Sequence, residues 1–184
     1  PVVVYASSST AYGKTAPVPF REDLPLDPHA PGSPYGASKR AMESIASMYA
    51  DLYGVKSVGL RLFSVYGPRI RHDLAPWLFT DAIYNNRPIT LIGSEKVRRD
   101  FTYVEDVVNA FIKALDYAPI IKHEIFNIGN DRPEELKKVI DLVENYLGKK
   151  TSIIRQAAHE SDPAETWADL TKARKSLGYS PKVN

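Results

Sequence analysis

The order of apolar segments along the chain is the feature that most limits its fold. Residues 2–6 form an apolar run of strand length, residues 35–53 carry apolar side chains at helical spacing, and residues 55–63 form a second apolar run. Two strands separated by a long helix pair in parallel, with the helix as the crossover. The sequence therefore predicts an α/β fold, with Gly54 ending the helix.

Shorter elements follow Pro68. We expect helices at residues 75–86, 133–147 and 171–177, and strands at 89–92, 124–128 and 152–155. Thr102 and Glu105 have the spacing of a capping box, which predicts a helix that starts there and runs to about Asp116. The Pro-rich stretch 17–34 is a long irregular loop, and such loops in compact domains usually have a function.

Composition excludes several classes of protein. The 184 residues contain no cysteine and four widely spaced histidines, so we expect no disulfide and no metal site. The net charge of +2 is scattered, which argues against a surface for nucleic acid or membrane. No apolar run is long enough to span a bilayer and no secretory signal opens the chain, so the expected location is cytoplasmic.

Two local patterns could carry chemistry. Tyr35 and Lys39 are four residues apart, which puts a phenol and an ammonium on one face of a helix. A neighbouring cation favours a phenolate, which can take a proton from a substrate hydroxyl and return it. The pattern is frequent, and Tyr35 packing beside a solvated Lys39 is the alternative. The hydroxyl run at residues 7–10 ends the first strand, where open α/β sheets bind ligands.

The chain resembles the extended short-chain dehydrogenase/reductase family, the NAD-dependent nucleotide-sugar epimerases and dehydratases. The resemblance covers nearly the whole chain and rests on motifs in a fixed order: Ser7-Ser8-Ser9-Thr10-Ala11-Tyr12-Gly13, Tyr35-Gly36-Ala37-Ser38-Lys39, Leu60-Arg61-Leu62-Phe63-Ser64-Val65-Tyr66-Gly67-Pro68, Arg99-Asp100-Phe101-Thr102-Tyr103-Val104-Glu105-Asp106-Val107, Phe126-Asn127-Ile128-Gly129, Asp162, Thr166-Trp167-Ala168-Asp169 and Lys172-Ala173. Each motif alone is weak, and their order is specific. The resemblance implies NAD as cofactor.

The resemblance also implies a domain organisation. Family members carry a Gly-rich dinucleotide-binding motif near the N-terminus, and this chain has none. We therefore expect the C-terminal portion of a family member. Residues 1–66 would be part of a Rossmann-like NAD-binding domain, without its first βαβ units. Residues 67–184 would mainly form a smaller α+β substrate-binding domain, with 103–130 returning to the Rossmann sheet. Alone, such a fragment is expected to be inactive.

Catalytic roles carry over from the family's motifs. Ser8 would hydrogen-bond the sugar oxygen that is oxidised, and Tyr35 would be the acid and base. Lys39 would bind the nicotinamide ribose and favour the phenolate. Phe63 matches a residue beside the nicotinamide, with core packing as its alternative role.

The two residues after Ser8 distinguish the reactions that members of the family catalyse. Dehydratases have Asp-Glu there, because elimination needs a second acid and base. Ser9 and Thr10 cannot do this work, so the resemblance implies a 4-epimerase that acts on a UDP-sugar through a transient 4-keto intermediate. At positions 64 and 71, Ser64 and Arg71 make the chain most similar to UDP-glucuronate 4-epimerases, which make UDP-galacturonate. An arginine fork suits a sugar carboxylate, although Arg69 is also available.

The resemblance implies two further contacts, although the match to the family's motif is incomplete at one of them. Arg99 matches an arginine on the diphosphate, and Asp162 matches an acid on the uridine side, although His159 stands where an arginine usually precedes that acid. One alternative is a UDP-glucose or UDP-N-acetylglucosamine 4-epimerase. Another is a sensor or scaffold that binds NAD or a nucleotide sugar without catalysis. Family members are often dimers, which here would form through the helix starting at Tyr35.

Overall fold

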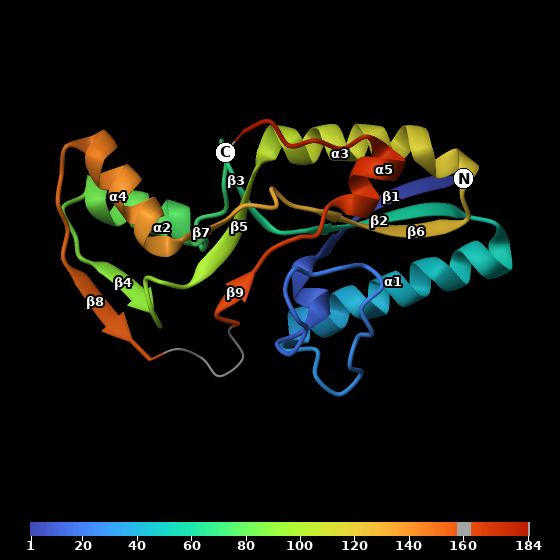
Figure 1. Cartoon of the computed structure of the whole chain (residues 1–184), viewed down its shortest axis with the longest axis horizontal. Coiled ribbons are helices and arrows are strands. Elements are labelled where there is room, and N and C mark those ends of the chain that lie inside the picture. Colours follow the sequence, from blue (N-terminus) through green and yellow to red (C-terminus); the bar gives the residue numbers. More distant parts are fainter. Residues whose placement is uncertain (158–162, 184) are drawn as a thin grey trace.

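The computed structural model describes residues 1–157 and 163–183. Its main sheet is parallel and consists of β1 (Val2–Ser8), β2 (Lys56–Leu62) and β6 (His123–Ile128) in the order β1-β2-β6. Helix α1 (Pro34–Tyr53) lies on one face, and α3 (Val104–Tyr117) and α5 (Thr171–Leu177) lie on the other (Figure 1). The predicted α/β fold with a parallel sheet is confirmed.

The two faces of this sheet differ in chemistry, because side chains alternate along each strand. Val58 and Leu60 of β2 pack against Val107 and Ala110 of α3 in an apolar core. The opposite face of β2 carries Ser57, Gly59 and Arg61 towards α1. Helix α1 in turn buries only Gly36, Glu43 and Ala50. One face of the sheet is thus apolar and the other is largely polar.

Local signals explain the limits of α1. The Ser33 hydroxyl caps its start by accepting a hydrogen bond from the Gly36 N–H at 3.0 Å, and Pro34 occupies the first turn. Gly54 ends the helix in the left-handed conformation, with φ 64° and ψ 23°, as predicted.

A second group of elements lies at the other end of the molecule (Figure 1). In its mixed sheet the central β5 (Arg98–Tyr103) pairs with β3 (Ser64–Tyr66) and β9 (Glu165–Thr166) in parallel and with β7 (Pro133–Glu135) antiparallel. The strands β4 (Ile89–Ile92) and β8 (Ile153–Gln156) form a parallel pair. Helices α2 (Ala75–Tyr84) and α4 (Leu136–Leu147) share an apolar core with β4. The 3₁₀ helices are η1 (Ser9–Tyr12) and η2 (Ala118–Ile120).

The structure corrects three details. Strand β5 was not predicted. The helix expected at 133–147 begins only at Leu136, because residues 133–135 pair with β5 as β7. The capping box at Thr102 is wrong, because Thr102 is still in β5 and its hydroxyl lies 3.5 Å from Asp100 Oδ1, while Tyr103 precedes α3 without a side-chain cap. The division into domains at residue 66 stays a prediction.

In residues 1–157 and 163–183, no helix is long and apolar enough to cross a membrane. The same residues contain no group of three His, Cys, Asp or Glu side chains arranged to hold a metal ion.

Candidate active site

The hydroxyl run folds into a tight turn at the carboxyl end of β1. Ser8 caps η1, and its Oγ accepts hydrogen bonds from the Thr10 N–H at 3.2 Å and the Thr10 hydroxyl at 2.9 Å. The turn packs directly against the start of α1. A Cβ at Gly36 would lie 2.7 Å from the Thr10 carbonyl oxygen and 2.4 Å from that of Pro31. Only glycine allows this approach, which brings Tyr35 next to the turn.

Tyr35 and Lys39 are paired as the spacing predicts. The Lys39 Nζ lies 5.4 Å from the centroid of the Tyr35 ring, and it donates a 2.8 Å hydrogen bond to the Ala6 carbonyl oxygen of β1. The Tyr35 side chain is half exposed, at 49%. The cation is therefore held between the phenol and the strand, and the phenol remains open to a substrate.

A second tyrosine in the same region is a poor candidate for proton transfer. Tyr12 is buried, and its hydroxyl donates a 2.7 Å hydrogen bond to Asn127 Oδ1. Burial raises the pKa of Tyr12 to about 12. A phenol that is neutral and inaccessible cannot exchange a proton with a substrate, so the geometry favours Tyr35.

Two hollows adjoin this region. The larger one, of about 510 Å³, is in the range of small-molecule sites, and Ser64 and Arg99 line it from β3 and β5. The smaller one, of about 120 Å³, is lined by Ser9 and Thr10 of the turn. Pro163 lines both, so the hollows are neighbours. The structure thus gathers predicted substrate-binding residues from distant parts of the chain around two adjacent hollows.

Arg71 already has an acidic partner. Its Nε donates a 3.0 Å hydrogen bond to Asp73 Oδ1, and its Nη2 bonds Asp73 Oδ2. These bonds raise the pKa of Arg71 and lower the pKa of Asp73. Asp73 lines the larger hollow, which places this ion pair at its margin.

The remaining predicted site residues fall in different surroundings. Phe63 is buried in the core, with its ring centroid 6.1 Å from that of Phe20. Arg99 donates a 3.0 Å hydrogen bond to the Arg98 carbonyl oxygen. Asp162 lies outside the described residues. Their roles toward a ligand stay predictions.

Sequence reasoning missed the role of Asp100, which is fully buried. Its carboxylate accepts hydrogen bonds from three backbone N–H groups, those of Asn130 at 2.6 Å, Asp131 at 3.1 Å and Ala168 at 3.0 Å. Burial raises the pKa of Asp100. A Cβ at Gly129 would lie 2.5 Å from Asp100 Oδ2, which explains the glycine after β6. Asp100 thereby joins β5 to the segment after β6 and to the segment after β9.

Asn127 has a similar role for the Pro-rich loop. Besides accepting from Tyr12, its side chain donates to the Phe20 carbonyl oxygen at 2.8 Å, and its backbone N–H donates to Glu22 Oε1 at 2.7 Å. Burial raises the pKa of Glu22. The amide of Asn127 between the apolar residues Phe126 and Ile128 was the available signal for these contacts.

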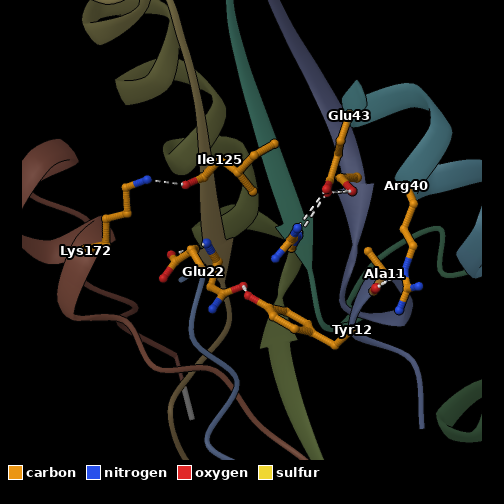
Figure 2. Close-up of polar contacts among 10 residues, drawn as sticks. Ala11, Tyr12, Glu22, Arg40, Glu43, Ile125 and Lys172 are labelled. Atoms are coloured by element: carbon orange, nitrogen blue, oxygen red, sulfur yellow. Dashed lines mark hydrogen bonds and ion pairs between the residues drawn. The ribbon is translucent and has the colours of Figure 1, made fainter. Parts of the chain in front are cut away.

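A buried ion pair joins α1 to the sheet. Arg61 of β2 donates to Glu43 of α1 through Nε to Oε1 at 2.9 Å and through Nη2 to Oε2 at 2.7 Å. The Ser7 hydroxyl donates to the same Oε1 at 2.5 Å. Figure 2 shows the Glu43 carboxylate directed into the space between α1 and the sheet. An arginine within an apolar strand requires such a partner, but its position in the sequence does not say which acid it is.

The fold and site define a class of protein: an open α/β sheet with a Tyr–Lys pair and a hydroxyl turn at its carboxyl edge. The model of the NAD dependent epimerase/dehydratase family matches residues 1–129. The chain therefore belongs to this family.

Particular relatives are similar over the whole chain. A UDP-glucuronate 4-epimerase from Thermodesulfobacterium geofontis is 36% identical over 183 residues, which are 99% of this chain and 55% of that protein. An uncharacterised protein from Methanocaldococcus jannaschii is 42% identical over 181 residues, 98% of this chain and 54% of that protein. The chain thus spans about half the length of the curated relatives it matches.

A solved structure is similar in fold as well as sequence. The UDP-glucuronic acid 4-epimerase from Bacillus cereus, in complex with UDP-glucuronic acid and NAD, superposes with a TM-score of 0.90 at 32% identity. The match covers 100% of this chain and 57% of that structure.

Proposed function

We propose that the protein is an NAD-dependent UDP-sugar 4-epimerase, with UDP-glucuronate as its substrate and UDP-galacturonate as its product. The observation that carries the proposal is the exposed Tyr35 phenol beside the Lys39 ammonium, at the edge of the sheet where α/β proteins bind ligands. The similarity to UDP-glucuronate 4-epimerases at the level of sequence and fold supports the same reaction.

The residues present fit an NAD cofactor. Lys39 supplies N–H donors and Tyr35 a hydroxyl, which together suit the hydroxyl groups of a nicotinamide ribose. Both lie at the start of α1, beside the end of β1. When bound, NAD would supply the acceptor, and then the donor, of the hydride from the sugar carbinol.

The chain's own residues would handle the proton and the orientation. Tyr35, as phenolate, would take the proton of the sugar hydroxyl and later return it, and Lys39 would favour the ionised phenol. Ser8 would hydrogen-bond the same oxygen, since its hydroxyl lies in the turn that packs against the start of α1. Ser9 and Thr10 provide no carboxylate for dehydration, which favours epimerisation.

The nucleotide sugar would occupy the two adjacent hollows. Ser64 and Arg99 line the larger one, where the guanidinium of Arg99 suits a diphosphate. Arg71 would bind the C6 carboxylate after exchanging its bond to Asp73 for one to the substrate. The existing Arg71–Asp73 pair also favours the alternative function, a 4-epimerase for UDP-glucose or UDP-N-acetylglucosamine, because a neutral sugar would leave that pair in place.

We also propose that the protein is a cytoplasmic dimer, formed through the outer face of α1. Five apolar side chains of this helix are each more than half exposed: Ile45, Met48, Tyr49, Leu52 and Tyr53. A second copy of the same face would cover them.

Proton NMR of the full-length protein with NAD and UDP-glucuronate tests the reaction. We expect the signals of UDP-galacturonate to appear, and Tyr35→Phe to lower the rate by a factor on the order of 10²–10⁴ because the acid and base is lost. Tyr53→Phe, which removes a hydroxyl from the other end of the same helix, serves as the control and should stay active. A wild-type protein that binds these ligands but converts no UDP-sugar would favour the sensor or scaffold instead.

A further inference from the structure

We infer that Ser7, Glu43 and Arg61 form a positioning device for the reaction, in which Glu43 sets the register between the end of β1 and the start of α1. The inference rests on the proposed function, because it concerns the residues that would handle the proton. We expect none of these three side chains to contact substrate or cofactor.

The geometry places this device directly behind the reacting groups. Tyr35, Lys39 and Glu43 follow one another at intervals of four residues, so they lie along one face of α1. Lys39 bonds the Ala6 carbonyl oxygen, and Glu43 bonds the hydroxyl of Ser7, the next residue of β1. Two consecutive residues of the strand are therefore tied to two consecutive turns of the helix.

The next residue along β1 is Ser8, the predicted contact of the sugar oxygen. A shift of α1 along the strand would thus change the separation of Tyr35 and Ser8. Reaction rates are sensitive to such changes, since a misplacement of about 1 Å can cost on the order of 10²-fold in rate. We therefore expect the precise placement of α1 to affect the rate of the reaction more than the binding of the substrate.

Burial gives the device its rigidity. Ser7, Glu43 and Arg61 are all buried, and Arg61 binds the Glu43 carboxylate with two parallel bonds, a fork geometry that fixes orientation as well as distance. The guanidinium also lies over the Tyr12 ring, with its Cζ 4.5 Å from the ring centroid. Arg61 Nη1 is buried without a hydrogen-bond partner in the described part of the chain, so Glu43 alone balances this charge there.

Removing Glu43 or Arg61 would leave an unpaired buried charge and could prevent folding. Ser7 offers a milder test, because Ser7→Ala deletes only the bond between Glu43 and β1 and leaves the ion pair intact. Ser57→Ala is the matched control. Ser57 is equally buried and hydrogen-bonds His123 Nδ1 at 2.8 Å on the same face of the sheet, but it lies near the other end of β2.

The experiment measures kcat and KM for UDP-glucuronate with the NAD-loaded full-length protein and its variants. We expect Ser7→Ala to lower kcat by about tenfold or more with KM changed by less than about twofold, because the lost contact positions α1 and binds nothing. Ser7→Thr, which keeps a hydroxyl, should restore kcat, and Ser57→Ala should retain it.

Equal effects of Ser7→Ala and Ser57→Ala on kcat, or a loss that appears only in KM, would overturn the inference while leaving the proposed function intact. A wild-type protein that converts no UDP-sugar would instead remove the proposed function, and the positioning role with it.

Discussion

Arg71 is the side chain on which the proposed substrate preference depends. It is 69% exposed and Asp73 is 63% exposed, and exposed ion pairs of this kind contribute little to stability because water screens them. A sugar carboxylate could therefore replace Asp73 at little energetic cost. Asp73 lines the hollow, so it would then lie near the sugar carboxylate that had replaced it.

The substitution Arg71→Ala tests this preference. We expect kcat/KM for UDP-glucuronate to fall by about tenfold or more relative to that for UDP-glucose, because only the acidic sugar loses a charge-assisted pair. Steady-state rates with both sugars measure the ratio. Arg69→Gln is the control, since it removes the other arginine of the segment. An unchanged ratio in Arg71→Ala would contradict carboxylate recognition by this residue.

Strand β5 shows how one buried carboxylate can organise several elements. Asp100 binds the backbone after β6 and the segment after β9, and all three partners are N–H donors. An asparagine would replace one acceptor oxygen with an NH₂ group, which cannot accept a hydrogen bond from a backbone N–H group. The hydrogen bonds that one carboxylate oxygen accepts would therefore be lost.

We expect Asp100→Asn to lower the free energy of unfolding of the full-length protein by about 3 kcal/mol, since a buried N–H group loses its charged acceptor. Urea denaturation measures the change. Asp131→Asn is the control because Asp131 forms a partly exposed ion pair with Arg174 and has a φ of 63°, which asparagine tolerates. Its cost should stay below about 1 kcal/mol, and an equal cost for both variants would exclude the organising role of Asp100.

At the scale of the whole molecule, one edge of the main sheet differs from the outer face of α1. At the edge formed by β6, Lys172 donates to the Ile125 carbonyl oxygen at 2.9 Å and Glu22 accepts from the Asn127 N–H, so side chains occupy the free backbone groups (Figure 2). Such coverage discourages pairing with another strand. Helix α1 instead buries the charged Glu43 and exposes large apolar side chains on its outer face, which points to association through that face.

The substitution Leu52→Lys tests that association. We expect the full-length wild-type protein to have the mass of a dimer in light scattering after size exclusion, and Leu52→Lys to shift it toward the monomer because a charge would be buried between the copies. Leu142→Lys is the control, since Leu142 is a similarly exposed leucine on α4. A wild-type monomer, or equal masses for both variants, would refute the dimer face.

Periodicity and local signals were sufficient for much of the fold. The strand–helix–strand order, the helix α1 and its Gly54 cap depend on neighbouring residues, and each was predicted correctly. The Tyr35–Lys39 pair is likewise local, because four residues make one turn of helix. Strand β5 and the late start of α4 were missed, since both result from pairing between residues 98–100 and 133–135.

The sequence by itself determined the parallel α/β order, the Tyr–Lys pair and the hydroxyl run, because these follow from the spacing of residues near one another in the chain. Only the tertiary structure decided which acid neutralises Arg61, which N–H groups Asp100 binds, and that Arg71 forms an ion pair with Asp73. A buried charge needs a partner, and the fold determines which residue supplies it. Glu43 and Arg61 meet because a helix crosses a sheet, a relation that the spacing of residues along the chain does not contain.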